Sequence, residues 1–175
     1  AKSYSDQAMI VLTNTSVEAS DAKVEDLKLS KDQKDLVDRV AEEFSSVIII
    51  VNAGNARELG FIEEHESIKA TLWVGTPGPR GTVSLGKVLT GEVNPSGRLV
   101  DTYVYDINTH PAIVNFGDYD YSNMERMAFL NYEESIYVGY RFFETYYEGN
   151  EDGYTEAVQF PFGYGLSYTD FIWEV

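Results

Sequence analysis

Four carboxylates near the start of the chain lie where this sequence could support chemistry: Glu18, Asp21, Glu25 and Asp26, in the polar segment at residues 15–28. They follow the stretch at residues 6–14, which predicts a strand buried on both faces. In parallel sheets, ligands bind beyond the carboxyl ends of the strands. If this strand runs parallel to its neighbour, Glu18 lies at the ligand-binding edge. From position alone, a solvated acidic loop is the more common explanation, because most surface acids have no functional role.

Other patterns that carry chemistry are missing from the sequence. There is no Gly-x-Ser-x-Gly nucleophile motif, and His65 and His110 have no further ligand at metal-binding spacing. Gly75, Gly78 and Gly81 recur at every third position, which differs from the dinucleotide-binding fingerprint. The chain has no cysteine, so disulfides and thiolate metal sites are excluded. We therefore expect neither a metal nor a cofactor.

Carboxylates and aromatic rings remain as the groups that could act on a substrate. Two carboxylates at a set separation are what glycoside hydrolysis requires, and the faces of Tyr and Trp rings stack against sugars. The same aromatics, which comprise 13 Tyr, 9 Phe and 2 Trp, also serve in most proteins to fill a core. Composition alone does not decide between these two uses.

The charge balance argues against several classes of partner. Asp and Glu number 29 against 13 Lys and Arg, which gives a net charge of -16. Such a surface repels phosphate backbones and anionic lipid, so we expect no nucleic-acid and no membrane partner. No apolar run is long enough to cross a bilayer, and the first residues lack the charged and apolar regions of a signal peptide. The compartment stays open, with the bacterial cytoplasm as the working assumption.

The elements that must position this acidic segment form an alternating α/β pattern. Residues 47–51 are all β-branched and apolar, and they predict the central strand of a parallel sheet. A capping box at Ser30 and Gln33 predicts a helix that feeds this strand in a right-handed crossover. We expect further strands at 68–75 and 99–105, and helices at 55–64 and 83–90, the latter closed by Gly91. The sequence thus predicts one domain over residues 1–175, a three-layer α/β/α sandwich with a mainly parallel, Rossmann-like sheet.

The last third of the chain has a less regular pattern. Residues 106–131 show no periodicity and predict a long surface excursion, whereas residues 136–143 look ordered. Residues 148–153 predict an acidic turn, and an apolar strand is expected at the end of the chain. We interpret this part as an irregular, aromatic-rich extension of the sandwich.

Two long motifs in this extension are similar to a known family. Residues 132–141, YEESIYVGYR, resemble the Tyr-x-Glu-x-Ile-x-Val-Gly-Tyr-Arg signature of family 3 glycoside hydrolases, the β-glucosidase family. Residues 161–169, PFGYGLSYT, resemble the signature that ends the same domain. Residues 29–36, 77–81 and 91–98 fit the family in the expected order. The resemblance covers nearly the whole chain.

The resemblance implies that this chain is one part of a retaining β-glycosidase. Members of the family pair a (β/α)8 barrel, which carries the nucleophilic Asp, with an α/β sandwich, and only the sandwich is matched here. In many members the sandwich supplies the general acid/base as the Glu of a Gly-Glu-Gly-x-Asp pattern. Residues 17–21 stand where that pattern is expected, which makes Glu18 the candidate acid/base and Asp21 a companion in substrate binding. Val17 and Ala19 replace both glycines, a change that restricts the backbone around the carboxylate.

The expected partners are a β-linked glucoside or oligosaccharide and the barrel domain of the same protein. Nothing in the chain corresponds to the barrel nucleophile, so the isolated domain is expected to be inactive. Two alternatives stay open. A non-catalytic carbohydrate-binding domain would place exposed aromatics, and no carboxylate, at the strand ends; a purely structural domain would fill that crevice with its own side chains. Glu134 and Arg141 are expected to pair with each other structurally rather than to contact a sugar.

Overall fold

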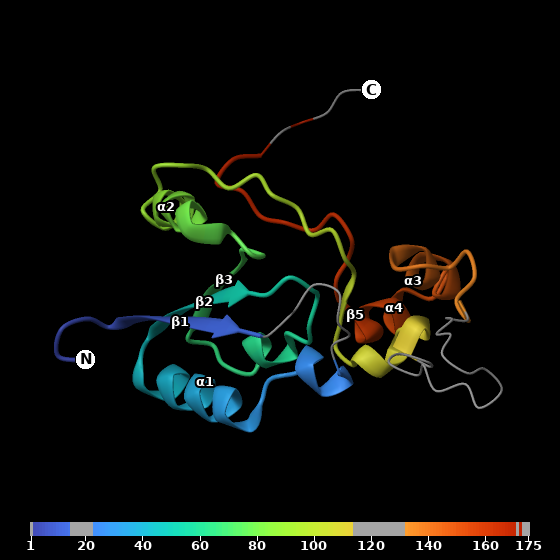
Figure 1. The fold of residues 1–175 in the computed structure, drawn as a ribbon, viewed down its shortest axis with the longest axis horizontal. Coiled ribbons are helices and arrows are strands. Elements are labelled where there is room, and N and C mark those ends of the chain that lie inside the picture. Colours follow the sequence, from blue (N-terminus) through green and yellow to red (C-terminus); the bar gives the residue numbers. More distant parts are fainter. Residues whose placement is uncertain (1, 15–22, 114–131, 171, 173–175) are drawn as a thin grey trace, which may run out of the picture.

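A parallel sheet forms the centre of the molecule. The computed structural model describes residues 2–14, 23–113, 132–170 and 172. Strands β1 (Gln7–Thr13), β2 (Ser46–Asn52) and β3 (Ile68–Trp73) form a three-stranded sheet in the order β1-β2-β3, and both pairs are parallel (Figure 1). The predicted central strand is therefore β2, and the predicted α/β fold with a mainly parallel sheet is confirmed.

The faces of β1 and β2 differ in their burial. β2 is covered on both sides, because the adjacent residues Ile49, Ile50 and Val51 are all almost completely buried. In β1 only alternate residues are buried, and Met9 and Val11 are 50% and 55% exposed. The expectation that residues 6–14 form a strand buried on both faces is therefore wrong. β1 lies at the edge of the described sheet, and its buried residues share one core with helix α1.

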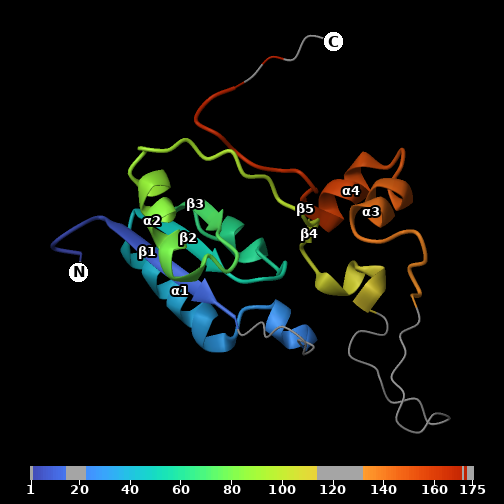
Figure 2. The same cartoon turned by 45° about the horizontal axis from the view of Figure 1, so that its top comes forward.

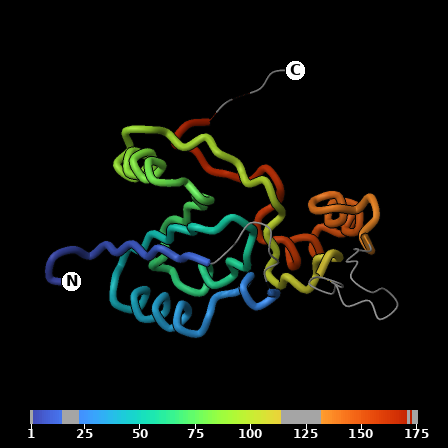
Figure 3. Tube along the Cα trace, in the orientation of Figure 1, coloured from blue at the N-terminus to red at the C-terminus, as the bar shows by residue number. Residues whose placement is uncertain are grey.

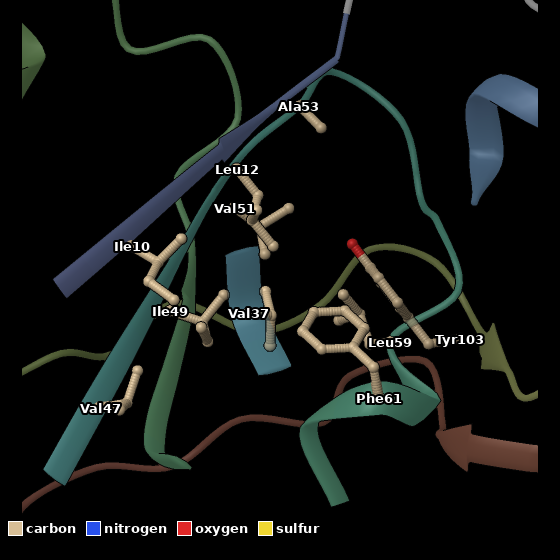
Figure 4. Packing of buried hydrophobic residues seen from close by; sticks show 10 residues of the cluster. All are labelled: Ile10, Leu12, Val37, Val47, Ile49, Val51, Ala53, Leu59, Phe61 and Tyr103. Carbon is tan, nitrogen blue, oxygen red and sulfur yellow. The ribbon is translucent and has the colours of Figure 1, made fainter. Parts of the chain in front are cut away.

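Helix α1 (Lys31–Glu43) begins at the predicted capping box. The Ser30 hydroxyl accepts a hydrogen bond from the Gln33 N–H at 3.2 Å, and Gln33 Oε1 accepts one from the Ser30 N–H at 3.2 Å. Val37 of this helix is fully buried against the sheet. Figure 4 shows how the side chains of the core converge between α1, β1, β2 and the segment after β2. The core comprises Ile10, Leu12, Val37, Val47, Ile49, Val51, Ala53, Leu59, Phe61 and Tyr103.

Helix α2 (Gly78–Leu89) lies on the side of the sheet opposite to α1 (Figures 1 and 2). It begins before the predicted residue 83, because Pro79 in the first turn is compatible with a helix start. Its end is as predicted: Thr90 is the cap and Gly91 follows with φ of +75°. None of its residues is buried, whereas Val37 and Ala41 of α1 are.

The segment after β2 does not form the predicted helix at 55–64. It contains only the short 3-10 helix η2 (Gly60–Glu63), although the predicted apolar contacts Leu59 and Phe61 are buried. The backbone N–H of Glu58 donates to the Leu27 carbonyl at 2.9 Å, outside any helical pattern. Contacts to a distant segment therefore replace the local hydrogen bonds that a helix would need.

The C-terminal part of the chain forms a second, smaller lobe. It contains β4 (Tyr103–Val104), the 3-10 helices η3 (Ile107–Thr109) and η4 (Pro111–Ile113), helices α3 (Tyr140–Tyr146) and α4 (Glu151–Ala157), and β5 (Val158–Phe160). Strands β4 and β5 pair antiparallel, separately from the main sheet. Fully buried Phe143 is the centre of a separate core with Val104, Ala157 and Val158. In the described part of the chain, no helix has both the length and the apolar character that a membrane span requires.

Several expectations for this lobe are corrected by the structure. The predicted strand at 99–105 is reduced to Tyr103–Val104, and the predicted acidic turn at 148–153 runs into helix α4. Helix α4 forms because Asn150 caps it through a hydrogen bond from the Gly153 N–H, with two acids in the first turn. Most of the predicted terminal strand, and most of the predicted excursion at 106–131, lies outside the described residues.

Two extended segments far apart in the sequence run side by side between α2 and the second lobe (Figure 3). The Leu99 N–H donates to the Tyr164 carbonyl, and the Gly163 N–H donates to the Leu99 carbonyl, both at 2.8 Å. Asn94 joins the segments further, because its Oδ1 accepts from the Tyr168 N–H and the Ser167 hydroxyl, and its Nδ2 donates to Thr169. The contact is close: a Cβ added at position 165 would lie 2.7 Å from the Gly97 carbonyl oxygen.

Replacement of Asn94 should loosen this junction. Asn94→Ala removes three hydrogen bonds to the C-terminal segment, and we expect a loss of about 1–2 kcal/mol in the free energy of unfolding. The measurement is the urea midpoint of the chain. Asn108→Ala is the matched control, because among the described residues its side chain bonds only to Asp106, two residues away. Equal shifts for the two variants would contradict the role given to Asn94.

Candidate functional site

The carboxyl ends of the three parallel strands form a polar edge. Thr13, the last residue of β1, is opposite Asn52 of β2, and Val51 is opposite Trp73, the last residue of β3. Just beyond the strands, Asn14 Nδ2 donates to Asn55 Oδ1 at 3.1 Å. The predicted condition, that the first strand runs parallel to the central one, is therefore confirmed, and the chain leaves β1 at this edge.

Gln33 connects helix α1 to this edge. Its Nε2 donates to the carbonyl oxygen of Thr13 at 2.8 Å, while its Oε1 accepts from the Ser30 N–H. The residue that caps the helix thus also binds the last carbonyl of β1. This contact fixes the point from which the chain enters residues 15–22.

Arg57 holds the other side of the same region. Its side chain is only 2% exposed, and Nη2 donates to the Lys28 carbonyl at 2.6 Å and to Gln33 Oε1 at 3.4 Å. Burial lowers the pKa of the Arg57 guanidinium. Within the described ranges, no hydrogen-bond partner reaches its Nε or Nη1.

The chain returns from residues 15–22 through the short 3-10 helix η1 (Val24–Leu27). The Leu27 carbonyl accepts from the Glu58 N–H, and Lys28 Nζ lies 3.2 Å from Glu58 Oε1. Glu58 Oε1 also accepts from the Ile107 N–H at 2.8 Å, which ties this region to the second lobe. Both flanks of residues 15–22 are therefore anchored at the same edge of the sheet.

The two predicted site residues, Glu18 and Asp21, lie outside the described residues. The structure describes the residues that flank them, Asn14 and Lys23, and the contacts that hold those flanks. Gln33 was recognised in the sequence only as a helix cap, and Arg57 was not recognised at all. The sequence around Arg57 does not indicate that this side chain is buried, because its burial depends on tertiary contacts.

His65 is not the isolated side chain that the sequence suggested. Its Nε2 lies 2.8 Å from Asp38 Oδ1, and Glu64 completes a group whose ligand atoms all lie within 4.8 Å. Lys34 Nζ already lies 2.8 Å from Glu64, and this hydrogen bond raises the pKa of Lys34. The lysine supplies the positive charge that a metal would bring. The group precedes β3, at the opposite end of the sheet from the polar edge.

The aromatic residues gather in the second lobe instead of at the polar edge. Tyr140 and Phe162 stack with their ring centroids 4.6 Å apart, and Arg141 lies 6.0 Å from the Tyr140 ring centroid. Among the described residues, no ion pair joins Glu134 to Arg141, so the expected structural pairing is wrong. The arginine packs on the neighbouring aromatic ring instead.

The sequence profile of the Glycosyl hydrolase family 3 C-terminal domain matches residues 1–168. The chain belongs to this family. This glycosyl hydrolase domain is 37% identical over 173 residues to a beta-glucosidase of Ruminococcus albus, covering 98% of the chain and 17% of the relative. It is 33% identical to beta-glucosidase A of Butyrivibrio fibrisolvens, over 99% of the chain and 22% of the relative.

Solved structures of beta-glucosidases share the fold of this family 3 domain. The beta-glucosidase of Paenibacillus barengoltzii superposes with a TM-score of 0.83 and 32% identity, over 99% of this chain and 18% of that one. Beta-glucosidase 3B of Thermotoga neapolitana, solved in complex with glucose, gives 0.78 and 33%, over 96% of this chain and 22% of that one. The domain spans about a fifth of the length of these relatives.

A histidine in the second lobe should make the stability of the domain depend on pH. The His110 ring packs edge-on against Phe143 with centroids 5.6 Å apart, and Nδ1 accepts from the Ala112 N–H. Burial lowers the pKa of His110 below its ordinary 6.5, against the opposing effects of Glu134 and Asp101. As the pH falls through this range, the unfolded chain binds the proton first, so the folded state loses stability.

His110→Gln, which cannot take up a proton there, should weaken that loss. The measurement is the urea midpoint of the wild type and the variant between about pH 8 and about pH 5, where histidine changes charge. As the pH falls from about 8, we expect the urea midpoint of the wild type to decrease more than that of His110→Gln. Parallel curves over the whole range would show that His110 does not respond in this way.

Proposed function

We propose that this domain completes the sugar-binding pocket of a retaining β-glucosidase and supplies its general acid/base through Glu18. The observation that supports this most directly is the anchoring of the chain at the carboxyl edge of a parallel sheet, through Thr13 before the acid-bearing segment and Lys28 after it. Ligands of such sheets bind at that edge. Membership of family 3 adds support, because many of its members carry the acid/base at the corresponding point of this domain.

The proposed chemistry divides between two carboxylates. The nucleophilic Asp comes from the barrel domain of the same protein and attacks the anomeric carbon. Glu18 protonates the leaving oxygen, and then, as a carboxylate, removes a proton from the water that hydrolyses the glycosyl-enzyme intermediate. Retention requires the two carboxyl groups to lie about 5–5.5 Å apart. Asp21, three residues further along, binds a hydroxyl group of the sugar.

The proposed barrel partner also accounts for apolar surface on the second lobe. Ile136, Tyr137, Val138, Tyr140 and Phe162 are exposed and come from the segments that carry the two family motifs. Exposed apolar side chains gathered in this way are typical of a surface that contacts another domain. The substrate follows from the named relatives: a β-linked glucoside or a short oligosaccharide.

The binding-module alternative has less support. It requires exposed aromatic side chains at the strand ends, for stacking on sugar rings. Trp73 lies at that edge, but it is partly buried and its indole N–H donates to the Ala53 carbonyl at 2.9 Å. The ring therefore serves the packing of β3 on the segment after β2.

The isolated domain should not hydrolyse an aryl β-glucoside, because its nucleophile lies in the barrel. The measurement compares purified residues 1–175 with the full-length enzyme at equal molar concentration. The enzyme serves as the positive control. Turnover by residues 1–175 alone would contradict the division of the two carboxylates between domains.

Glu18→Gln in the full-length enzyme should affect substrates according to their leaving group. A poor leaving group, as in an alkyl β-glucoside, needs protonation, so kcat/KM should fall by about 10²–10⁴-fold. A dinitrophenyl β-glucoside needs little protonation and should retain its glycosylation rate, with azide restoring breakdown of the intermediate. Asp21→Asn in the same assays should raise KM for both substrates.

Glu25→Gln is the matched control for this series, because Glu25 is an exposed acid just beyond the same segment. It should leave both substrates within about twofold of the wild type, as for most surface changes. If Glu18→Gln lowers kcat/KM for both substrates by the same factor and azide has no effect, Glu18 is not the acid/base.

A further inference from the structure

Three side chains that can bind a metal ion converge where helix α1 meets the segment before β3. Asp38 comes from α1, Glu64 caps the 3-10 helix η2, and His65 follows it. One ligand atom of each residue lies within 4.8 Å of the other two. The spacing of residues in the sequence did not indicate this group, because Asp38 is distant from the other two along the chain. The fold alone brings the three together.

The backbone that carries this group is held by contacts of its own. Val37 of α1 and Phe61 of η2 are both buried in the main core. The Ser67 hydroxyl donates to the Ala41 carbonyl at 2.7 Å, which ties the segment before β3 to α1. The ligands are therefore presented by a fixed framework, and rotations of side chains suffice to close them around an ion.

The ligand types and distances suit a transition-metal ion. His65 Nε2 lies 2.8 Å from Asp38 Oδ1, and a metal ion can take the place of the hydrogen atom that these two atoms share. Ligand atoms around a tetrahedral zinc ion are roughly 3.3 Å apart. Glu64 can approach to that distance because its side chain is 55% exposed. An imidazole nitrogen among the ligands favours zinc and similar ions over calcium and magnesium, which prefer oxygen ligands.

A positive charge already stands at this group. Lys34 Nζ lies 2.8 Å from Glu64 Oε2 and 3.8 Å from Asp38 Oδ1. Two carboxylates thus face one lysine, in a chain whose net charge of -16 attracts cations. Exposed ion pairs of this kind contribute little to stability. A divalent ion can therefore displace the ammonium group of Lys34 at small cost.

We propose that Asp38, Glu64 and His65 form a binding site for a divalent transition-metal ion of the zinc type, which replaces the Lys34 ammonium group. The bound ion joins α1 to the segment before β3 and stabilises the folded chain, because only folding brings the three ligands together. The site lies at the opposite end of the sheet from the polar edge. Its role is structural, and it does not depend on the role proposed for Glu18.

The test measures the binding of zinc chloride to the full-length enzyme by isothermal titration calorimetry. We expect His65→Gln to weaken the binding of one zinc ion per chain by at least about tenfold, since even a partner that hydrogen-bonds to a metal ligand contributes about 10–100-fold. His110→Gln, the same substitution at the other histidine of residues 1–175, is the matched control and should leave the zinc affinity unchanged. Equal affinities of His65→Gln and the wild type would overturn the proposal.

Lys34→Met gives an outcome that loss of the fold cannot imitate. It removes the competing ammonium group and keeps all three ligands, so the zinc affinity should rise by about fivefold. Lys31→Met is the matched control, because Lys31 pairs with Asp35 on the same helix and is exposed. A zinc affinity of Lys34→Met that does not exceed that of the wild type would show that no ion replaces the lysine.

The thermal midpoint of the full-length enzyme gives a second readout, separate from hydrolysis. An excess of zinc chloride should raise the midpoint of the wild type by about 2–5 °C more than that of His65→Gln. Calcium chloride or magnesium chloride at the same concentration should produce no such difference. If either salt stabilises the wild type over His65→Gln as much as zinc does, the assignment to a transition metal is wrong.

Discussion

The exclusion of water from both faces of β2 is the constraint on which the rest of the structure depends. A strand covered in this way leaves its backbone groups no partner except neighbouring strands, so β1 and β3 must pair with it along its length. Both pairs are parallel, which brings the ends Thr13, Asn52 and Trp73 to one edge. That edge is polar because the backbone N–H and C=O groups beyond the strand ends need hydrogen-bond partners outside the sheet.

The second lobe is tied to this edge by polar contacts more than by a shared core. Tyr103 is the exception, since it packs in the main core while its strand pairs with β5; burial and the charge of Asp101 raise its pKa to about 12. Glu58 binds Lys28 on one side and the Ile107 N–H on the other. A movement of the second lobe would therefore reach Lys28 through the contacts of Glu58.

The sequence predicted those parts of the fold that depend on local pattern. The apolar run of β2, the capping box at Ser30 and the glycine after α2 all have a local physical cause, and each was found where predicted. The helix at 55–64 failed because its polar groups bond to Leu27 and Lys28, far away in the chain. The exposure of one face of β1 could not be predicted for the same reason, because segments distant in the sequence determine which face of the strand is covered. At the candidate site, the edge was predictable, but the burial of Arg57 was not.

Residues 17–21 depart from the pattern of the family at two positions. In that pattern a glycine stands at each of these positions, and glycine leaves the backbone many conformations. Val17 and Ala19 permit fewer, so the unfolded chain has less conformational entropy to lose at these positions than a chain with two glycines would have. The contacts of the Thr13 and Lys28 carbonyls hold the described chain before and after this stretch. In this sequence, side chains therefore restrict the backbone between two points that hydrogen bonds already hold.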